Sequence, residues 1–407
     1  MKNIIRFFYY HMNTIYLIIK HLFRIVPYRF IGEISVLGLI ILFLEFNIGE
    51  EKTLDWRLFY KDHRSETAID SNIVVIKIDD LSFRSIHGGY VNRDFLADLV
   101  SELKSYNPKV IGLDFLLTTP YSDRIDLVLS ELKKADTTYS DPDQRLANAL
   151  KDDIPMVLAF DLISNDKNKI HVIEPIDCFL LDNIHTGYTK VKIEKDEICR
   201  HILLFKNLSA KDVPSFATQI CRSAGKDAGK DFKPKRIHFK SPVKTFATFS
   251  SKDVLEGKFR QVSESWFQDK IILVGVTYSG SGDFFRTPLT GIMSNREELP
   301  GVFIHAMVVK NILDDDFIPA KNSYYMFIIL VITLLIIAAG IILNNSLFST
   351  LTIIVFGSIH ILLCFRLFLN GINIPLLVPV IIMTLGIITG ILIVKIRNEY
   401  RKNLTQS

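Results

Sequence analysis

Acidic side chains stand at or near the ends of three apolar runs in the first half of the chain. They are Asp79 and Asp80 after 73–78, Asp114 within 110–117, and Asp161 after 156–160. In open α/β sheets, ligand crevices form outside the carboxyl ends of the strands, so these carboxylates are predicted to line such a crevice. There they would bind a ligand or cation, pair with Arg93, or cap neighbouring helices; the sequence leaves these alternatives open.

A loop rich in glycine and serine, GVTYSGSGD, runs from Gly275 to Asp283 after a further apolar run. It has neither the G-x-G-x-x-G spacing of a dinucleotide site nor the GK[ST] ending of a phosphate loop. Its glycines are expected to permit tight turns or a close approach of the backbone. No G-x-S-x-G elbow and no H-E-x-x-H motif occurs, so no nucleophile or zinc signature indicates an enzyme.

The elements that must position these residues alternate between strands and helices. Runs of β-branched and apolar residues predict strands over 73–78, 110–117, 156–160 and 270–276. Apolar residues at helical spacing predict helices over 93–106, over 142–152 with Asp141 as the cap, and from Pro300-Gly301 to about Leu313. This alternation predicts an α/β domain with a mixed, mostly parallel sheet. The stretch 165–265, with short apolar runs and many lysines, is expected to be an insertion of antiparallel strands.

Hydrophobic residues make up 49% of the 407 residues, and the excess gathers in four segments. These predict one transmembrane helix before the α/β region and three after it, over 30–48, 323–343, 347–369 and 374–394. Five bases and no acid precede the first segment, and Lys395, Arg397, Arg401 and Lys402 follow the last, which places both termini in the cytoplasm. Residues 49–322 are then extracytoplasmic, and residues 395–407 form a short cytoplasmic tail.

Residues 1–29 are apolar but interrupted by bases, and we interpret them as an amphipathic helix on the inner leaflet of the plasma (inner) membrane. A fifth span over 4–28 is the alternative. The net charge of +4 divides into −3 within 49–322 and +7 in the remaining residues. Positive membrane flanks predict contact with anionic lipids and not with nucleic acid.

Four cysteines, Cys178, Cys199, Cys221 and Cys364, are too few for a disulfide-stapled scaffold. One bridge, such as Cys178–Cys199, is compatible with the sequence. No metal-ligand spacing occurs among the cysteines and histidines, so neither a metal nor a cofactor is expected.

Several motifs in order resemble the second class of CHASE domain, the cyclase/histidine-kinase-associated sensory extracellular domain. They are LDWR at 54–57, IVVIKIDDLSF at 73–83, VIGLDFLL at 110–117, KIILVGVTYSGSGDFFRTPL at 270–289 and PGVFIHAMVVKNIL at 300–313. The resemblance covers roughly residues 50–320 and implies one span before the sensor and three after it. The tryptophan-proline turn of the family is replaced by Gly89-Tyr90-Val91-Asn92. The resemblance to the family also adds Thr287 and His305 to the candidate residues. A histidine in a helix such as the one predicted from Pro300-Gly301 is, however, more often a hydrogen-bonded core residue than a ligand.

Family members usually continue into a cytoplasmic cyclase or kinase, whereas about 13 residues follow the last predicted span here. We therefore expect a stand-alone membrane sensor, not an enzyme, that acts on a separate cytoplasmic effector such as a cyclase or kinase. It is a possible homodimer, and its ligand or envelope stimulus is unknown. The alternatives are a membrane scaffold or envelope-interaction protein without ligand sensing and, less favoured, an extracytoplasmic metal-dependent enzyme. The ligand-binding candidates are Asp79, Asp80, Arg93, Asp114, Asp283, Thr287 and His305.

Overall fold

The fold is that of a computed structural model in which two compact units are distinguished, Leu58–Ile318 and the combination of Met1–Arg57 with Pro319–Ser407. The described residues are 49–320 without 65–68, 87–90, 122–140, 152, 165–169, 209–210, 260–265 and 291–297, together with 324–325, 327–328, 331–332, 335, 346–377 and 379–380.

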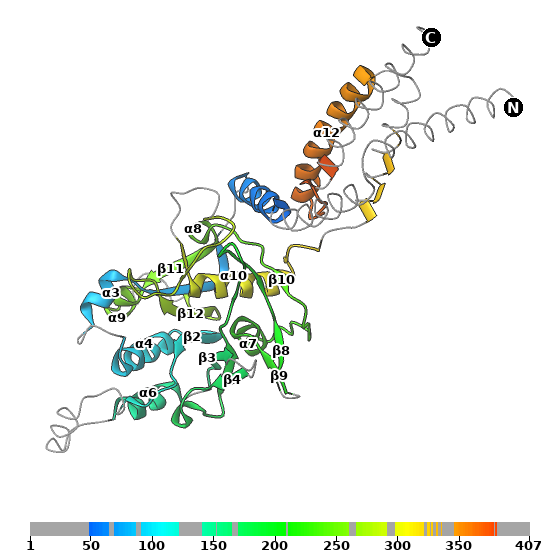
Figure 1. The fold of residues 1–407 in the computed structure, drawn as a ribbon. Coiled ribbons are helices and arrows are strands. Elements are labelled where there is room, and N and C mark those ends of the chain that lie inside the picture. Colours follow the sequence, from blue (N-terminus) through cyan, green and yellow to red (C-terminus); the bar gives the residue numbers. More distant parts are fainter. Residues whose placement is uncertain are drawn as a thin grey trace, which may run out of the picture. The chain divides into compact units, whose positions relative to one another are not determined.

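A seven-stranded sheet forms the centre of the larger unit, in the order β11-β1-β12-β2-β3, with both β4 and β5 paired to β3 (Figure 1). The pairs within it are parallel except for β3 with β4. This confirms the expected α/β class with a mixed, mostly parallel sheet. The strands are β1 (Asp70–Ile78), β2 (Val110–Leu116), β3 (Met156–Ser164), β4 (Ile170–Ile173), β5 (Ile184–Tyr188), β11 (Phe246–Ser250) and β12 (Ile271–Val276).

Alternate residues of the strands enter two separate hydrophobic layers, as the two-residue period of a strand requires. Val74 and Ile76 of β1 pack with α4, α6 and α9, whereas Ile73 and Val75 pack with α7 and α10. The sheet is therefore covered by helices on both faces, which explains why its central strands are apolar throughout. The helices are α3 (Asp80–Ser85), α4 (Arg93–Ser105), α6 (Pro142–Leu150), α7 (Phe216–Ser223), α9 (Ser251–Leu255) and α10 (Gly301–Asp314).

The predicted helices begin and end close to their expected positions because their caps are local. The side chain of Asn92 accepts from the Phe95 N–H at the start of α4, and Asp141 accepts from the Asp143 N–H at the start of α6, as predicted. Asp315 takes a left-handed conformation, with φ of 51°, at the end of α10. These local signals need no tertiary contact to act.

The expected insertion over 165–265 is only partly antiparallel. Its small antiparallel sheets are formed by β6 (Lys192–Ile193), β7 (Cys199–Ile202) and β10 (Lys235–Arg236), and by β8 (Phe205–Leu208) and β9 (Lys211–Pro214). However, β5 and β11 from the same stretch are parallel members of the main sheet. The prediction missed them because IHTGY and FATFS are short and contain too few apolar residues to stand out as buried strands.

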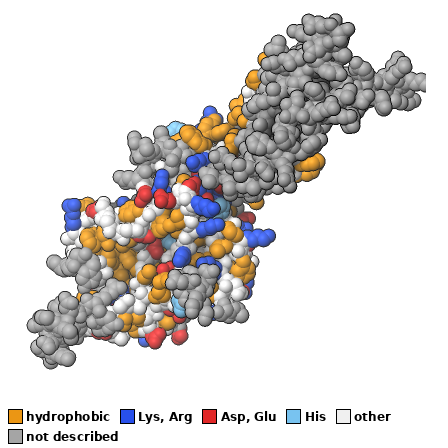
Figure 2. Space-filling model, viewed as in Figure 1, with side chains coloured by type: hydrophobic (Ala, Val, Ile, Leu, Met, Phe, Trp, Pro, Cys, Tyr) orange, Lys and Arg blue, Asp and Glu red, His pale blue; other side chains and the backbone are white. Residues whose placement is uncertain are grey.

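Shorter elements complete the described fold: η2 (Asp177–Phe179), α8 (Pro242–Thr245), and the antiparallel pair β13 (Phe284–Phe285) and β14 (Leu299–Pro300). All four cysteines are free thiols, so Cys178 and Cys199 are not bridged. On the face seen in Figure 2, acidic and basic side chains are interspersed among hydrophobic ones.

The smaller unit contains residues 49–57 of a helix over 49–64, and α12 (Ser346–Leu369), which coincides with the predicted span 347–369. The predicted spans 30–48, 323–343 and 374–394 lie wholly or largely outside the described residues, as do 1–29 and 395–407. Within the described part of the chain, no helix meets the length and hydropathy that a membrane crossing requires. The four spans stay predictions.

Candidate functional site

Two glycines in neighbouring strands allow helices to lie close to the sheet. A Cβ atom on Gly275 of β12 would come within 2.5 Å of Val302 Cβ in α10. A Cβ atom on Gly112 of β2 would come within 2.6 Å of Ile220 Cδ1 in α7. Because Gly112 faces α7, Asp114 two residues later points to the same face of the sheet.

Asp114, Asp283 and His305 meet at this place, and we call them the acid–histidine cluster. His305 lies one helical turn after Val302, and its Nε2 atom is 3.9 Å from Asp114 Oδ1, with side chains 5% and 10% exposed. The Asp283 carboxylate lies against Gly301, where a Cβ atom would be 2.5 Å from Oδ2. The Asp283 carbonyl accepts from the Gly301 N–H at 3.1 Å. The cluster thus joins β2, the loop after β12 and the start of α10.

The polar atoms of the cluster are poorly satisfied. At 3.9 Å, the His305–Asp114 contact is too long for a hydrogen bond. His305 Nδ1 is buried and has no hydrogen-bond partner in the described structure. The His305 ring instead contacts the ring of Phe216, the first residue of α7, with 5.3 Å between centroids in an edge-on arrangement. Two carboxylates and an imidazole are therefore enclosed with little to offset their charge.

Burial controls the protonation of all three groups. It raises the pKa of Asp114 to about 7. Burial and then the charge of Asp114 raise the pKa of Asp283 to about 6, against the opposing effects of His305 and a backbone hydrogen bond at Gly301. Burial lowers the pKa of His305 to about 4, with Asp283 acting in the opposite direction. Near neutral pH the histidine is therefore largely uncharged, and the two carboxyls retain protons that exposed carboxyls would have lost.

Such a cluster takes up a proton, or the cationic group of a ligand, more readily than an exposed pair of acids would. Either event neutralises negative charge that the surrounding apolar side chains cannot offset. Among the described residues, no group of three or more His, Cys, Asp and Glu side chains has the arrangement of a metal site.

The comparison with family models identifies this domain. The model described as the CHASE2 domain matches residues 34–342, which include every strand of the main sheet and the whole acid–histidine cluster. The chain belongs to the CHASE2 domain family. This match confirms the resemblance noted in the sequence. CHASE2 domains are extracellular sensory domains and not catalytic ones. Neither curated proteins nor solved structures yielded a match.

Two of the predicted site residues of this CHASE2 domain cap or tie the ends of elements. Asp79 caps α3: its Oδ1 accepts from the Ser82 N–H and the hydroxyls of Ser82 and Ser250 at 2.8–3.1 Å. These hydrogen bonds hold the pKa of Asp79 below its usual value in spite of burial. Asp80 accepts from the Ser279 backbone N–H at 3.1 Å and from its hydroxyl at 3.2 Å, and so fixes the glycine-rich loop.

Arg93 forms a separate buried ion pair, which sequence reasoning missed. Its Nε atom donates to Asp143 Oδ1 at 2.9 Å, its Nη2 atom donates to the Thr119 carbonyl, and its guanidinium lies 5.4 Å from the Phe179 ring centroid. The other carboxylate oxygen of Asp143 accepts from the Tyr121 N–H at 2.6 Å. The sequence signal for Asp143 was weak, because an acid in the first turn of a helix usually needs no partner beyond that helix.

Thr287 is buried at the start of a turn that ends at Thr290. The Thr290 hydroxyl donates to the Thr287 carbonyl at 3.0 Å, and the Thr287 N–H donates to the same hydroxyl at 2.8 Å. These hydrogen bonds of Thr287 belong to the turn. Of the seven predicted candidates, the structure brings together Asp114, Asp283 and His305, and places Asp79, Asp80, Arg93 and Thr287 in other local arrangements.

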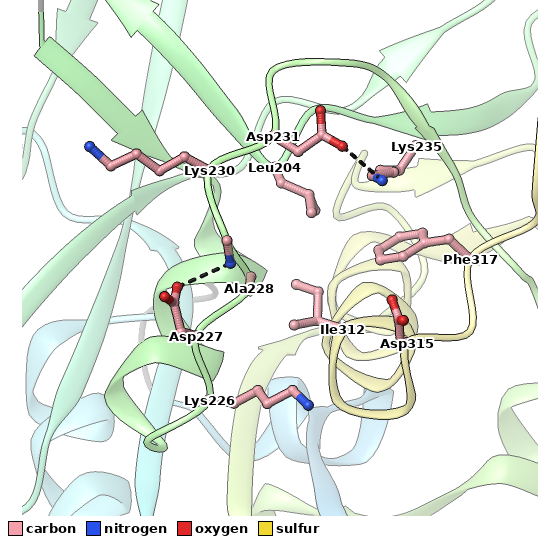
Figure 3. A pocket seen from close by; sticks show the side chains of 11 residues that line it. Leu204, Lys226, Asp227, Ala228, Lys230, Asp231, Lys235, Ile312, Asp315 and Phe317 are labelled. Carbon is pink, nitrogen blue, oxygen red and sulfur yellow. Dashed lines mark hydrogen bonds and ion pairs between the residues drawn. The ribbon is translucent and has the colours of Figure 1, made fainter.

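A pocket of about 380 Å³ lies elsewhere in the CHASE2 domain, beside the end of α10 (Figure 3). Leu204, Ile312 and Phe317 point towards its centre, whereas Lys230 points away. Lys235 pairs with Asp231 at 2.7 Å, so much of the charge around the pocket is already compensated. The pocket contains none of the predicted site residues and serves below as a control position.

Proposed function

We propose that this CHASE2 protein is a membrane-anchored sensor in which the acid–histidine cluster responds to the stimulus. The observation that carries the proposal is the enclosed pair of acids, Asp114 and Asp283, beside a histidine with an unpartnered Nδ1 atom. A change in pH or ligand concentration outside the cell alters most strongly the charge state of buried groups that have no compensating partner. In a domain of a sensory family, such groups are therefore the place to look for the response.

The physical basis is a difference in binding between two states. A stimulus shifts a conformational equilibrium only if it interacts more favourably with one state than with the other. The two states differ in whether the start of α10, at Gly301, lies against Asp283. If it moved away, the Asp283 carboxylate would return to water. Proton uptake or a cationic ligand group favours the state in which the two remain in contact. The stimulus is thus a change in pH or a ligand that carries a cation.

The signal then passes through the predicted membrane spans to a separate cytoplasmic effector. This part rests on the predicted topology and on the family, whose members usually join the sensor to a cyclase or a kinase. Anionic lipid is the expected partner of the basic segments that flank the spans. In a homodimer, the predicted spans of one protomer could move relative to those of its partner.

The test is thermal unfolding of the full chain in lipid nanodiscs, measured between pH 4 and pH 8 and against metal ions, nucleotides, sugars, amino acids and amines. The variants are D114N and D283N. The controls are D80N, which alters an exposed acid held by Ser279, and K226A, which alters the separate pocket.

We expect that D114N loses the part of the pH response centred near pH 7, together with stabilisation by any ligand that binds the cluster, and that both controls retain them. A ligand present at 100 times its dissociation constant stabilises the native state by about 2.7 kcal/mol. A pH and ligand response that is the same in D114N and in the unaltered protein would overturn the proposal. A ligand response lost only in K226A would transfer the sensing role to the pocket.

A further inference from the structure

A buried polar network joins segments that are far apart in the sequence, all within the unit Met1–Arg57 and Pro319–Ser407. The Glu50 carboxylate accepts from Arg57 Nη2 at 3.1 Å, from the Leu376 N–H at 2.9 Å and from the Leu377 N–H at 2.7 Å. The Glu50 and Arg57 side chains are 2% and 0% exposed. Both oxygens of a buried carboxylate are thus used to hold one short segment of backbone.

Arg57 binds the same segment from the other side. Its Nη1 atom donates to the Ile374 carbonyl at 2.8 Å and to Asn373 Oδ1 at 3.4 Å. Asn373 in turn donates from Nδ2 to the Pro319 carbonyl at 3.1 Å. The guanidinium lies 5.4 Å from the centroid of the Phe368 ring near the end of α12. Charge-assisted hydrogen bonds of this kind are about twice as strong as neutral ones, and each group here has several.

The positions of these residues agree with the predicted topology. Glu50 follows the predicted span 30–48, Pro319 precedes 323–343, and Asn373 lies between 347–369 and 374–394. Four spans with both termini inside place all three of these positions on the outer side. The network connects them directly, which requires that they lie on the same side of the membrane.

The helix that carries Glu50 and Arg57 continues without a break to residue 64. Residues 58–64 belong to the sensory unit, in which Asp62 Oδ1 accepts from the Ser241 N–H at 2.8 Å. One continuous helix therefore holds the polar network at one end and a contact of the sensory unit at the other.

We propose that Glu50 and Arg57 form a clasp that fixes this helix to the connection at 370–377, so that a displacement of the helix within the sensory unit reaches that connection. A buried ion pair favours one arrangement strongly, because removing either partner leaves the other charge buried alone. The clasp thus converts a movement of the helix into a movement of the backbone between the two predicted spans. It does not depend on which stimulus the domain senses.

Hydrogen exchange of the full chain in nanodiscs tests the clasp through two amides. In E50A, the peptide containing the Leu376 and Leu377 amides should exchange at least tenfold faster, because these amides lose their acceptor. K52A alters an exposed residue of the same helix and should leave the exchange unchanged. E50Q, which keeps one oxygen acceptor, should give an intermediate rate and provides the test if E50A does not fold. Unchanged exchange in both Glu50 variants would overturn the clasp.

Transmission is tested by a change at the other end of the helix. D62A removes the acceptor for the Ser241 N–H. When it is the only substitution in the chain, we expect it to speed hydrogen exchange of the Leu376 and Leu377 amides. In the E50A background, D62A should add nothing, because the clasp is already open. If D62A leaves these amides unaffected while exchange near Ser241 rises, the helix does not transmit and the proposal fails. No ligand is used, so this outcome is independent of the response of the acid–histidine cluster.

Discussion

Two of the buried charged sites among the described residues of the CHASE2 domain differ in how completely their charges are satisfied. In one, Arg93 and Asp143 form an ion pair at 2.9 Å. Arg93 also donates to a backbone carbonyl, and Asp143 also accepts from a backbone N–H. In the other, Asp114 and His305 stand 3.9 Å apart, and the Nδ1 atom of the imidazole has no partner.

The difference separates a structural role from a responsive one. The satisfied ion pair joins the start of helix α4 to the start of helix α6. The acid–histidine cluster is held in an apolar layer between the sheet and two helices, and burial moves the pKa of Asp114 to about 7 and that of Asp283 to about 6. The charge of this cluster therefore changes as pH moves through about 6 to 7. Four variants test this contrast.

The largest effect is expected from R93A. Removing the guanidinium leaves Asp143 buried without a counter-ion, which typically costs about 3–5 kcal/mol of unfolding free energy. Chemical denaturation of the full chain in nanodiscs would measure this loss. A loss below about 1 kcal/mol would show that the Arg93–Asp143 pair is not the structural site that we describe.

The second variant, D114N, should change the dependence of stability on pH. The folded protein binds a proton at Asp114 more tightly than the unfolded chain does, so this carboxyl stabilises the fold at low pH and loses that effect as pH rises through about 7. At pH 4 the free energy of unfolding of D114N should be close to that of the unaltered protein. At pH 8 it should be higher by about 2–4 kcal/mol.

The contribution of His305 has the opposite sign, because its lowered pKa of about 4 destabilises the fold as pH falls below its usual value. It is present in both proteins and largely cancels in the comparison. Denaturation curves at five pH values would measure the difference, and a difference independent of pH would contradict the assignment of Asp114 as the group that titrates.

The third variant, G275A, tests the close approach that assembles the cluster. The new methyl group would meet Val302 Cβ, an atom fixed to the backbone of α10, so we expect a loss of about 1–3 kcal/mol in thermal unfolding. G112A is the matched control, because its methyl group would meet the movable ends of Ile220 and Phe216. Equal losses in the two variants would argue against the tight contact of α10 with β12.

The smallest effect is expected from R145A. Arg145 pairs with Asp94 and Asp98, but its side chain is 43% exposed, and ion pairs in water contribute less than about 1 kcal/mol. The same denaturation assay as for R93A applies. A loss as large as that of R93A would mean that burial does not distinguish the two ion-paired arginines.

The sequence by itself determined the class of fold and much of its local structure. The alternation of apolar runs with helical periodicity predicted β1, α4, β2, α6, β3, β12 and α10, and Asp141 was identified as a cap, because these signals depend on neighbouring residues. The motifs also sufficed to identify the sensory family.

Only the tertiary structure decided which candidate residues meet. The position at a strand end assigned Asp79, Asp80 and Asp114 to one edge of the sheet, but their faces and hydrogen-bond partners come from distant segments. Ser250 and Ser279 engage the first two, while Gly275 admits the helix that brings His305 to Asp114. Spacing along the chain cannot show this, because the approach of a helix to a sheet depends on side-chain volume at positions that are distant in the sequence, such as Gly275 and Val302.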